Sequence, residues 1–249
     1  QLYGSGAENG MAAIAGPVLD VVSRIAMPVD PTAFDFLSLS LAVTAADTFT
    51  SRREAADGWA REIHLTTALA DPDRWTPAIP TLEKALCFLS GDQWTLAFTD
   101  GGEERPALRP RVANKLVLDG CQSACLYSGG LDSAIGMLNL RASGHRAVLV
   151  SHAYSHDASR QEEILRHVHG GMPRLALHAH PRQQLDHPND VQMRTRSFNF
   201  FAMGALAAAT LAQLLPAGAR VPLIIPENGL IAINPPLTNR RIGALSTRT

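Results

Sequence analysis

Residues 128–133, with the sequence Ser-Gly-Gly-Leu-Asp-Ser, combine the side chains and the bare backbone that phosphate binding requires. The two glycines let an anion approach the main chain, and the hydroxyls of Ser128 and Ser133 can donate hydrogen bonds. A strand-like run precedes this stretch and a run with helical spacing follows it. Free amide groups and the positive end of the helix dipole form an anion site at such a point. The stretch therefore predicts a phosphate-binding turn at the start of a helix.

Two familiar phosphate loops do not fit these residues. The GxxxxGK[ST] loop needs a lysine, and none lies near Gly130; the dinucleotide turn GxGxxG spaces its glycines differently. The simpler alternative is a helix cap, with Asp132 or Ser133 at the helix N-terminus. The strand before the turn, the helix after it and the pattern downstream favour the phosphate loop.

The chain beyond Val112 alternates between strand and helix signals. We expect strands at 123–127, 146–154, 174–180 and 221–226, and helices at 131–143, 159–170 and 198–215. This spacing indicates βαβ units and therefore an α/β fold, with a parallel sheet covered by helices on both faces. Ligands bind such sheets beyond the carboxyl ends of the strands, which is where residues 128–133 fall.

The first part of the chain has a different pattern. Residues 36–49 predict a helix, and residues 59–69 alternate as a half-buried strand does. Residues 84–98 contain two apolar runs joined by Ser90, Gly91 and Asp92, which indicates a hairpin. The polar stretch 99–111 predicts a linker. We therefore expect a smaller α+β N-terminal domain at 1–111 and a second domain at 112–249.

Composition limits the classes of partner. The 249 residues are 46% hydrophobic and carry a net charge of -1, so the protein is globular and lacks a field that would attract nucleic acid or an anionic membrane. The 3 cysteines form no even framework, which favours a cytoplasmic location. The apolar run 198–215 is interrupted by Asn199 and Gln213, which favours a buried helix over a membrane span. The chain begins at Gln1 and ends abruptly at Thr249, so we expect a fragment.

Residues 128–133 match, at every fixed position, the SGGxDS signature of the ATP-pyrophosphatase (PP-loop) family. The resemblance implies a Rossmann-like (HUP-type) sheet and a loop that holds the pyrophosphate of ATP while the α-phosphorus is attacked. Residues 151–168 and 194–209 resemble segments of the QueC-type enzymes, the 7-cyano-7-deazaguanine synthases. Residues 59–65 and 87–98 and the tail from Ile225 to Thr249 resemble more closely the QueC-like component of the Qat anti-phage defence system.

This resemblance implies ATP-dependent adenylation of a 7-deazapurine carboxylate, with Mg²⁺ as the metal and AMP and pyrophosphate as products. It assigns phosphate contacts to the loop and to two arginines, a place near Mg²⁺ to Asp132, and a place beside the adenine or the base substrate to the end of the second strand. The residues concerned are Ser128, Gly129, Gly130, Leu131, Asp132, Ser133, His152, Arg194 and Arg196 for ATP, and Tyr154, His156, Glu227 and Asn228 for the substrate. The sequence leaves two alternatives open: the histidines are acid–base groups or ordinary turn residues, and Glu227 and Asn228 recognise a base or form a surface turn.

The chain departs from the QueC pattern in two respects. Cys121 and Cys125 do not supply a four-cysteine zinc site, so a zinc site either lies in a part of the protein beyond Thr249 or is absent. The additional N-terminal domain favours transfer of the base to a partner protein in a defence complex. A nucleotide-binding scaffold without turnover is the main alternative. A sulfur-transfer or tRNA-modifying enzyme is a third, which the scattered cysteines and the neutral charge disfavour.

Overall fold

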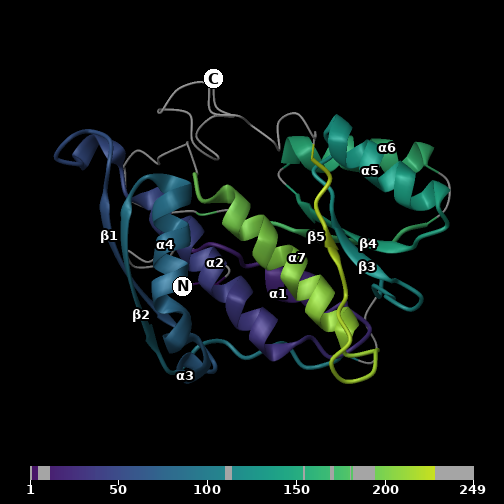
Figure 1. The fold of residues 1–249 in the computed structure, drawn as a ribbon, viewed down its shortest axis with the longest axis horizontal. Helices are drawn as coiled ribbons and strands as arrows, with labels where there is room; N and C mark the ends of the chain where they lie inside the picture. The colour runs from purple at the N-terminus through teal and green to yellow at the C-terminus, as the bar shows by residue number, and fades with distance from the viewer. Residues whose placement is uncertain are drawn as a thin grey trace.

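A computed structural model shows an α/β protein with two sheets, each built of parallel strands, and helices between them (Figure 1). The structure describes residues 2–4, 12–109, 114–153, 155–168, 171–179, 181 and 194–227, with only the backbone described at Ser155 and His156. Helices α2 (Pro31–Phe49) and α7 (Arg196–Ala212) run between the sheets. Helix α4 (Ile79–Ser90) lies against the sheet on the left of Figure 1, and α5 (Leu131–Ala142) and α6 (Ser155–His167) cover the face of the other sheet that points away from α2 and α7.

The larger sheet has four parallel strands in the order β5-β4-β3-β6. Its strands are β3 (Ser123–Leu126), β4 (Ala147–His152), β5 (Arg174–Leu177) and β6 (Leu223–Ile224). The expected parallel sheet is therefore confirmed. Because β4 and β6 pair with opposite sides of β3, the strand order reverses there, and ligands bind at the carboxyl ends near such a reversal.

Alternate residues of β3 and β4 enter different cores, as the strand period of two requires. Ala124 and Val148 pack with α1 (Val18–Val22), α2 (Pro31–Phe49) and α7 (Arg196–Ala212) on one face. Cys125 and Leu149 pack with α5 (Leu131–Ala142) and α6 (Ser155–His167) on the other. Both faces of the sheet are thus covered by helices.

Helix α2 explains why the two parts of the chain share one interior. Asp30 caps its N-terminus by accepting the Ala33 N–H at 2.8 Å, and Pro31 occupies the first helical position. One side of the helix, including Leu37, packs with α7 in the core that the four-stranded sheet also enters, while the other, including Leu39, packs against the smaller sheet. A helix that is apolar all round is buried, as this one is.

The smaller sheet corrects one expectation. Strands β1 (Glu62–Ala68) and β2 (Gln93–Thr99) run parallel, joined by α3 (Pro72–Trp75), a 3₁₀ turn (Thr76–Ala78) and α4 (Ile79–Ser90). The predicted hairpin at 84–98 is therefore wrong: its first apolar run is the end of α4. Gly91, with a φ of 73°, is the left-handed cap of that helix rather than the turn of a hairpin.

The division at residue 111 stays a prediction, but the apolar core crosses it. A single cluster joins Phe34 and Leu41 to Val150, Leu175 and Leu206. Residues 101–109 form no helix or strand, which agrees with the predicted linker. Within this stretch the Arg105 guanidinium donates a hydrogen bond to the Val29 carbonyl. The N-terminal part is therefore packed onto the sheet domain rather than tethered beside it.

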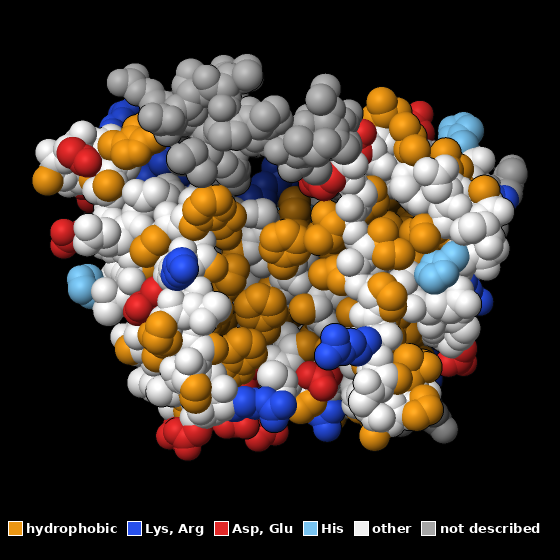
Figure 2. All heavy atoms as spheres, in the orientation of Figure 1, with side chains coloured by type: hydrophobic (Ala, Val, Ile, Leu, Met, Phe, Trp, Pro, Cys, Tyr) orange, Lys and Arg blue, Asp and Glu red, His pale blue; other side chains and the backbone are white. Residues whose placement is uncertain are grey.

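Apolar side chains gather over the middle of the face seen in Figure 2, where α7 runs, and most charged side chains lie around them. No broad basic patch is visible among the described side chains on this face. None of the described helices has the length and apolar character needed to cross a bilayer.

Candidate functional site

A cavity of about 210 Å³ lies at the carboxyl ends of β3, β4 and β6, where the strand order reverses. The strand ends supply Ser128, His152 and Glu227 to its lining, and α7 supplies Arg196 and Phe200. The cavity thus occupies the position in which parallel α/β sheets bind ligands.

The loop after β3 approaches this cavity with its backbone fixed by local hydrogen bonds. The Ser128 hydroxyl lies 3.1 Å from the Ser133 hydroxyl and accepts the Gly130 N–H at 3.3 Å. The Ser133 hydroxyl in turn donates to the Gly130 carbonyl at 3.0 Å. Gly130 is the N-cap of α5, so both hydroxyls lie at the positive end of that helix. The arrangement offers hydroxyl donors and a helix N-terminus to an anion.

Gln161 of α6 ties this loop to the end of β4. Its fully buried side-chain amide donates to the Ser128 carbonyl at 3.1 Å and to the His152 carbonyl at 3.2 Å. Arg174 donates to the Gln161 Oε1 at 2.7 Å, which fixes the orientation of the amide. Two strand ends that border the cavity are therefore held together by one side chain.

Arg196 supplies the cationic wall of the cavity. Its guanidinium lies 3.6 Å from the Asp157 carboxylate of α6 and 5.1 Å from the centre of the Phe200 ring. Asp157 also lines the cavity, so a carboxylate and a guanidinium face the same space. Because both side chains are part exposed, their ion pair is weak and can exchange for a stronger anionic ligand.

His152 is buried at the end of β4, and its Nε2 accepts the Ala179 N–H at 3.3 Å. Its ring meets the His178 ring edge to face, with centres 5.9 Å apart. The Nε2 is therefore the unprotonated nitrogen in this arrangement. Such a ring contributes shape and an apolar face to the cavity wall.

The structure brings together five of the residues proposed from the sequence: Ser128, Ser133, His152, Arg196 and Glu227 line the cavity. Gly129 and Gly130 shape the loop backbone behind them. Leu131 is 75% exposed, and Asp132 is exposed in the first turn of α5. Neither residue is among the described residues that line the cavity. Tyr154, Asn228 and the side chain of His156 lie outside the described residues.

Arg194 lies elsewhere than expected. Its guanidinium donates to the Ser90 carbonyl at 2.9 Å and stacks over the Trp59 ring at 4.1 Å. Both partners belong to the N-terminal part of the chain. Arg194 thus joins the two parts of the protein, and it is absent from the described lining of the cavity.

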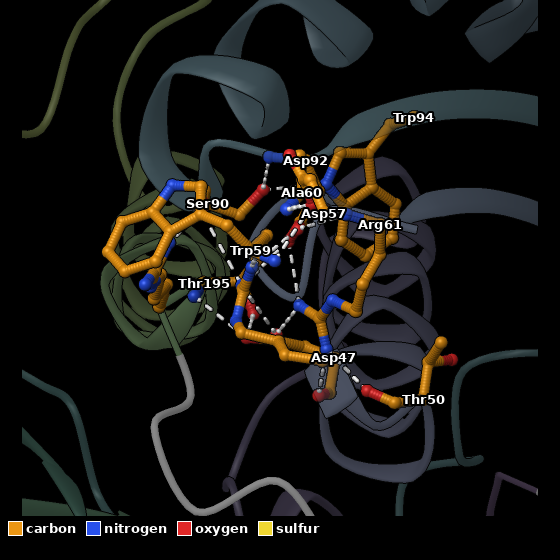
Figure 3. Close-up of polar contacts among 12 residues, drawn as sticks. Asp47, Thr50, Asp57, Trp59, Ala60, Arg61, Ser90, Asp92, Trp94 and Thr195 are labelled. Carbon is orange, nitrogen blue, oxygen red and sulfur yellow. Dashed lines mark hydrogen bonds and ion pairs between the residues drawn. The ribbon is translucent and has the colours of Figure 1, made fainter. Parts of the chain in front are cut away.

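Sequence reasoning missed a buried network of charged side chains behind the start of α7 (Figure 3). Asp92 accepts hydrogen bonds from Arg52 at 2.6 Å and from Arg61 at 2.7 Å, and Arg61 also pairs with Asp47. It also missed Asp157 and Gln161. Asp157 could have been proposed as a site residue, because it follows shortly after the end of a strand. Asp47 and Asp92 could not, because both lie far from the loop in sequence and only the fold brings them close to the start of α7.

The thiols of Cys121 and Cys125 lie in surroundings that disfavour the thiolate form. Burial raises the pKa of the Cys125 thiol to about 11, and burial also raises the pKa of Cys121 despite the opposing effect of Arg146. Both thiols are therefore protonated at neutral pH, which disfavours thiolate chemistry. Within the described ranges, no three His, Cys, Asp or Glu side chains are grouped so that they could hold a metal ion.

Comparison of the chain with protein-family models, with curated proteins and with solved structures found no match.

Proposed function

We propose that the protein is an adenylating enzyme that cleaves ATP to AMP and pyrophosphate in the cavity at the end of β3. The observation that carries this proposal is the coincidence of the SGGLDS sequence with the strand end, the helix N-terminus and the cavity. Together with the strand order, this supports a Rossmann-like sheet of the HUP type that carries a PP-loop, preceded by an accessory N-terminal unit.

In this proposal the hydroxyls of Ser128 and Ser133 and the amide of Gly130 exchange their hydrogen bonds within the loop for the β- and γ-phosphates, which the Gly129 amide and the N-terminus of α5 also hold. Arg196 neutralises charge that grows on the departing pyrophosphate, since a guanidinium can contact phosphate oxygens in pairs. His152 lies beside the nucleoside or the base.

The carboxylates at the cavity favour ATP as its magnesium complex. Asp157 and Glu227 both line the cavity, and with Arg196 they leave it short of the positive charge that free ATP would need. Mg²⁺ prefers carboxylate oxygens, phosphates and water as ligands, so these two side chains fit the ion, and the exposed Asp132 lies in the first turn of α5 beside the loop. Bound magnesium would supply charge neutralisation for the pyrophosphate.

For the second substrate we propose a 7-deazapurine carboxylate, as the resemblance to QueC-type enzymes implies. The carboxylate oxygen attacks the α-phosphorus, the bond between the α-phosphorus and the bridging oxygen breaks, and pyrophosphate leaves. Attack of an amine on the acyl adenylate then forms an amide and releases AMP. Ammonia and an amino group of a partner protein in an anti-phage defence complex are the two candidate acceptors.

Turnover with α-labelled ATP tests this proposal. The protein is incubated with Mg²⁺, labelled ATP and 7-carboxy-7-deazaguanine, with and without ammonia, and AMP is separated by chromatography. We expect AMP that depends on the acid, and its loss in Ser128→Ala and Asp132→Ala, with circular dichroism and melting temperature as controls for folding. ATP binding without AMP in any mixture would contradict adenylation and leave a nucleotide-binding scaffold.

A further inference from the structure

We infer that Asp47 is a positioning residue for the cavity, which acts by holding Thr195 and thereby the guanidinium of Arg196. The inference rests on the proposed function only in assigning phosphate to Arg196. The Asp47 side chain belongs to α2 and is buried, and it does not itself line the cavity.

Asp47 binds the residue immediately before α7. Its Oδ2 accepts both the Thr195 N–H at 3.0 Å and the Thr195 hydroxyl at 2.8 Å (Figure 3). Thr195 is the N-cap of α7, and its own side chain does not cap the helix. The hydroxyl therefore serves a contact between elements that lie 148 residues apart in sequence, rather than local helix capping.

The Asp47 carboxylate is itself held in place. Arg61 binds its Oδ1 and also donates to the Asp47 carbonyl at 2.8 Å and to the Thr50 carbonyl at 2.6 Å. The same guanidinium is bound by Asp92, which also pairs with Arg52. A buried carboxylate with partners on both oxygens has little freedom to turn, so Thr195 is held against a rigid acceptor.

The contact is the first in a row of hydrogen bonds, here called the α2–α7 seam, that runs along α7 from Thr195 to Thr210. One turn further along α7, the Asn199 Nδ2 donates to the Thr44 hydroxyl at 2.8 Å. At the opposite end of α7, the Thr210 hydroxyl accepts the Asp30 N–H at 3.3 Å. Asp47 and Thr195 close this seam at the end nearest to the cavity.

Because the first turns of α7 line the cavity, the position of Thr195 determines where their side chains lie in it. Arg196, Phe200 and Met203 all line it, at a spacing that places them on one side of the helix. Phe198 lies on the opposite side of the helix and packs against the N-terminal part of the chain, and Asn199, on the side adjoining the cavity-lining residues, donates to Thr44 of α2. A shift or rotation at Thr195 would therefore move the Arg196 guanidinium relative to the loop on α5.

Thr195→Val is the sharpest variant, because valine keeps the shape of threonine, removes the hydroxyl contact and leaves the Thr195 N–H contact possible. Asp47→Asn is less suitable, since it would leave the buried guanidiniums of Arg52 and Arg61 with the single carboxylate of Asp92. Thr195→Ser keeps the hydroxyl and serves as the matched control. Mg-ATP dissociation constants are measured by titration calorimetry for these variants, for Arg196→Gln and for the double variant Thr195→Val/Arg196→Gln.

We expect Thr195→Val to weaken Mg-ATP binding about three- to tenfold, because it loses a hydrogen bond to a charged acceptor that orients Arg196. Thr195→Ser should bind as the wild type does. In the Arg196→Gln background Thr195→Val should have no further effect, since the residue acts through Arg196. Unchanged affinity in Thr195→Val, or an equal loss in both backgrounds, would overturn the inference.

Hydrogen exchange separates this inference from the proposed function. In Thr195→Val the amides of residues 198–200 should exchange faster than in the wild type, with α2 amides around Leu39 unchanged. If the wild type bound no Mg-ATP, the proposed function would fail, and hydrogen exchange alone would then test whether Asp47 positions the start of α7. Unchanged exchange at 198–200 would then overturn the positioning role of Asp47.

Discussion

Gly129 and Gly130 are neighbours in the loop, but the structure makes different demands on them. Gly129 has a φ of 79°, and a Cβ at this position would lie 2.8 Å from the Gln161 Cγ. Gly130 has a φ of -81°, and the nearest atom to its Cβ would be the Ser128 Oγ at 3.4 Å. The first position therefore needs glycine for both conformation and space, whereas the second tolerates a methyl group.

Gly129→Ala should consequently lower the free energy of unfolding by about 1–2 kcal/mol or more, because the left-handed conformation and the contact with Gln161 both oppose it. Gly130→Ala should stay within about 0.5 kcal/mol of the wild type. Urea denaturation of both variants tests this difference. Equal stabilities would show that the loop does not have the backbone described.

The turn at residues 128–133 between a strand and a helix could be predicted because its signals are local: six adjacent residues carry the glycines and the hydroxyls. The place of Arg194 could not, because its partner Ser90 lies 104 residues earlier and belongs to a different element. An arginine near the start of a helix is equally suited to a phosphate or to a carbonyl and an aromatic ring. Tertiary contacts decided between them.

At the level of elements, α5 and the end of β6 meet closely at Gly136. A Cβ on this residue would lie 2.5 Å from the Pro226 Cβ, and Pro226 lines the cavity. The proline ring cannot rotate away as a flexible side chain could. Gly136 therefore sets the distance between the helix that follows the loop and the far wall of the cavity.

Gly136→Ala tests this packing. Alanine is favoured over glycine in a helix by about 1 kcal/mol, but overpacking costs about 1–3 kcal/mol, so the net effect should be destabilising. We also expect weaker Mg-ATP binding, because Pro226 must move. Asn139→Ala, on an exposed position of α5, is the control for propensity alone and should be neutral or stabilising. A more stable Gly136→Ala with unchanged binding would contradict the contact.

The network between α2, β1 and β2 predicts a loss of stability in acid. Burial by itself would raise the pKa of Asp92, but hydrogen bonds from Arg61 and Arg52 outweigh burial and hold the pKa at about 2, against an ordinary value of 3.8. The folded protein thus keeps this carboxylate ionised where the unfolded chain binds a proton. The contribution of this carboxylate to the free energy of unfolding is complete above about pH 5 and is lost as the pH falls from about 4 to 2.

Unfolding free energies measured between pH 5 and pH 2 should therefore fall by on the order of 2 kcal/mol through this group. Asp92→Asn should be less stable at pH 7 and should lose less between pH 4 and pH 2. Asp73→Asn, which alters an exposed carboxylate, should follow the wild-type profile. An Asp92→Asn profile parallel to that of the wild type would contradict the network.

The elements also show why sequence reasoning succeeded for the larger sheet and failed for the smaller one. The strands of the larger sheet are short apolar runs separated by helices, a pattern with few interpretations. In the N-terminal part, Gly91 suits either a hairpin turn or the left-handed cap of a helix. The apolar residues before it, with Leu82 and Leu86 four positions apart on the buried side of α4, follow the helical period instead.

At the scale of the whole molecule, the shared core predicts one cooperative unfolding transition. Phe34 and Leu37 of α2 pack in the same cluster as Val150, Leu175 and Leu206 of the sheet domain. Separating residues 1–111 from 112–249 would expose this surface on both pieces. We expect the calorimetric and van't Hoff enthalpies of the intact chain to agree, and residues 112–249 alone to lack a cooperative transition. Independent, cooperative folding of that fragment would restore a division into separate domains.

In the proposed complex, ATP lies with its phosphates between the loop after β3 and Arg196. The most direct measurement is a crystal structure of the protein with Mg²⁺ and an ATP analogue that has a methylene group between the α- and β-phosphates. We expect β- and γ-phosphate density within hydrogen-bonding distance of Ser128, Ser133 and the Arg196 guanidinium. Density for the analogue elsewhere, or a cavity without it at saturating concentration, would show that the cavity is not the ATP site.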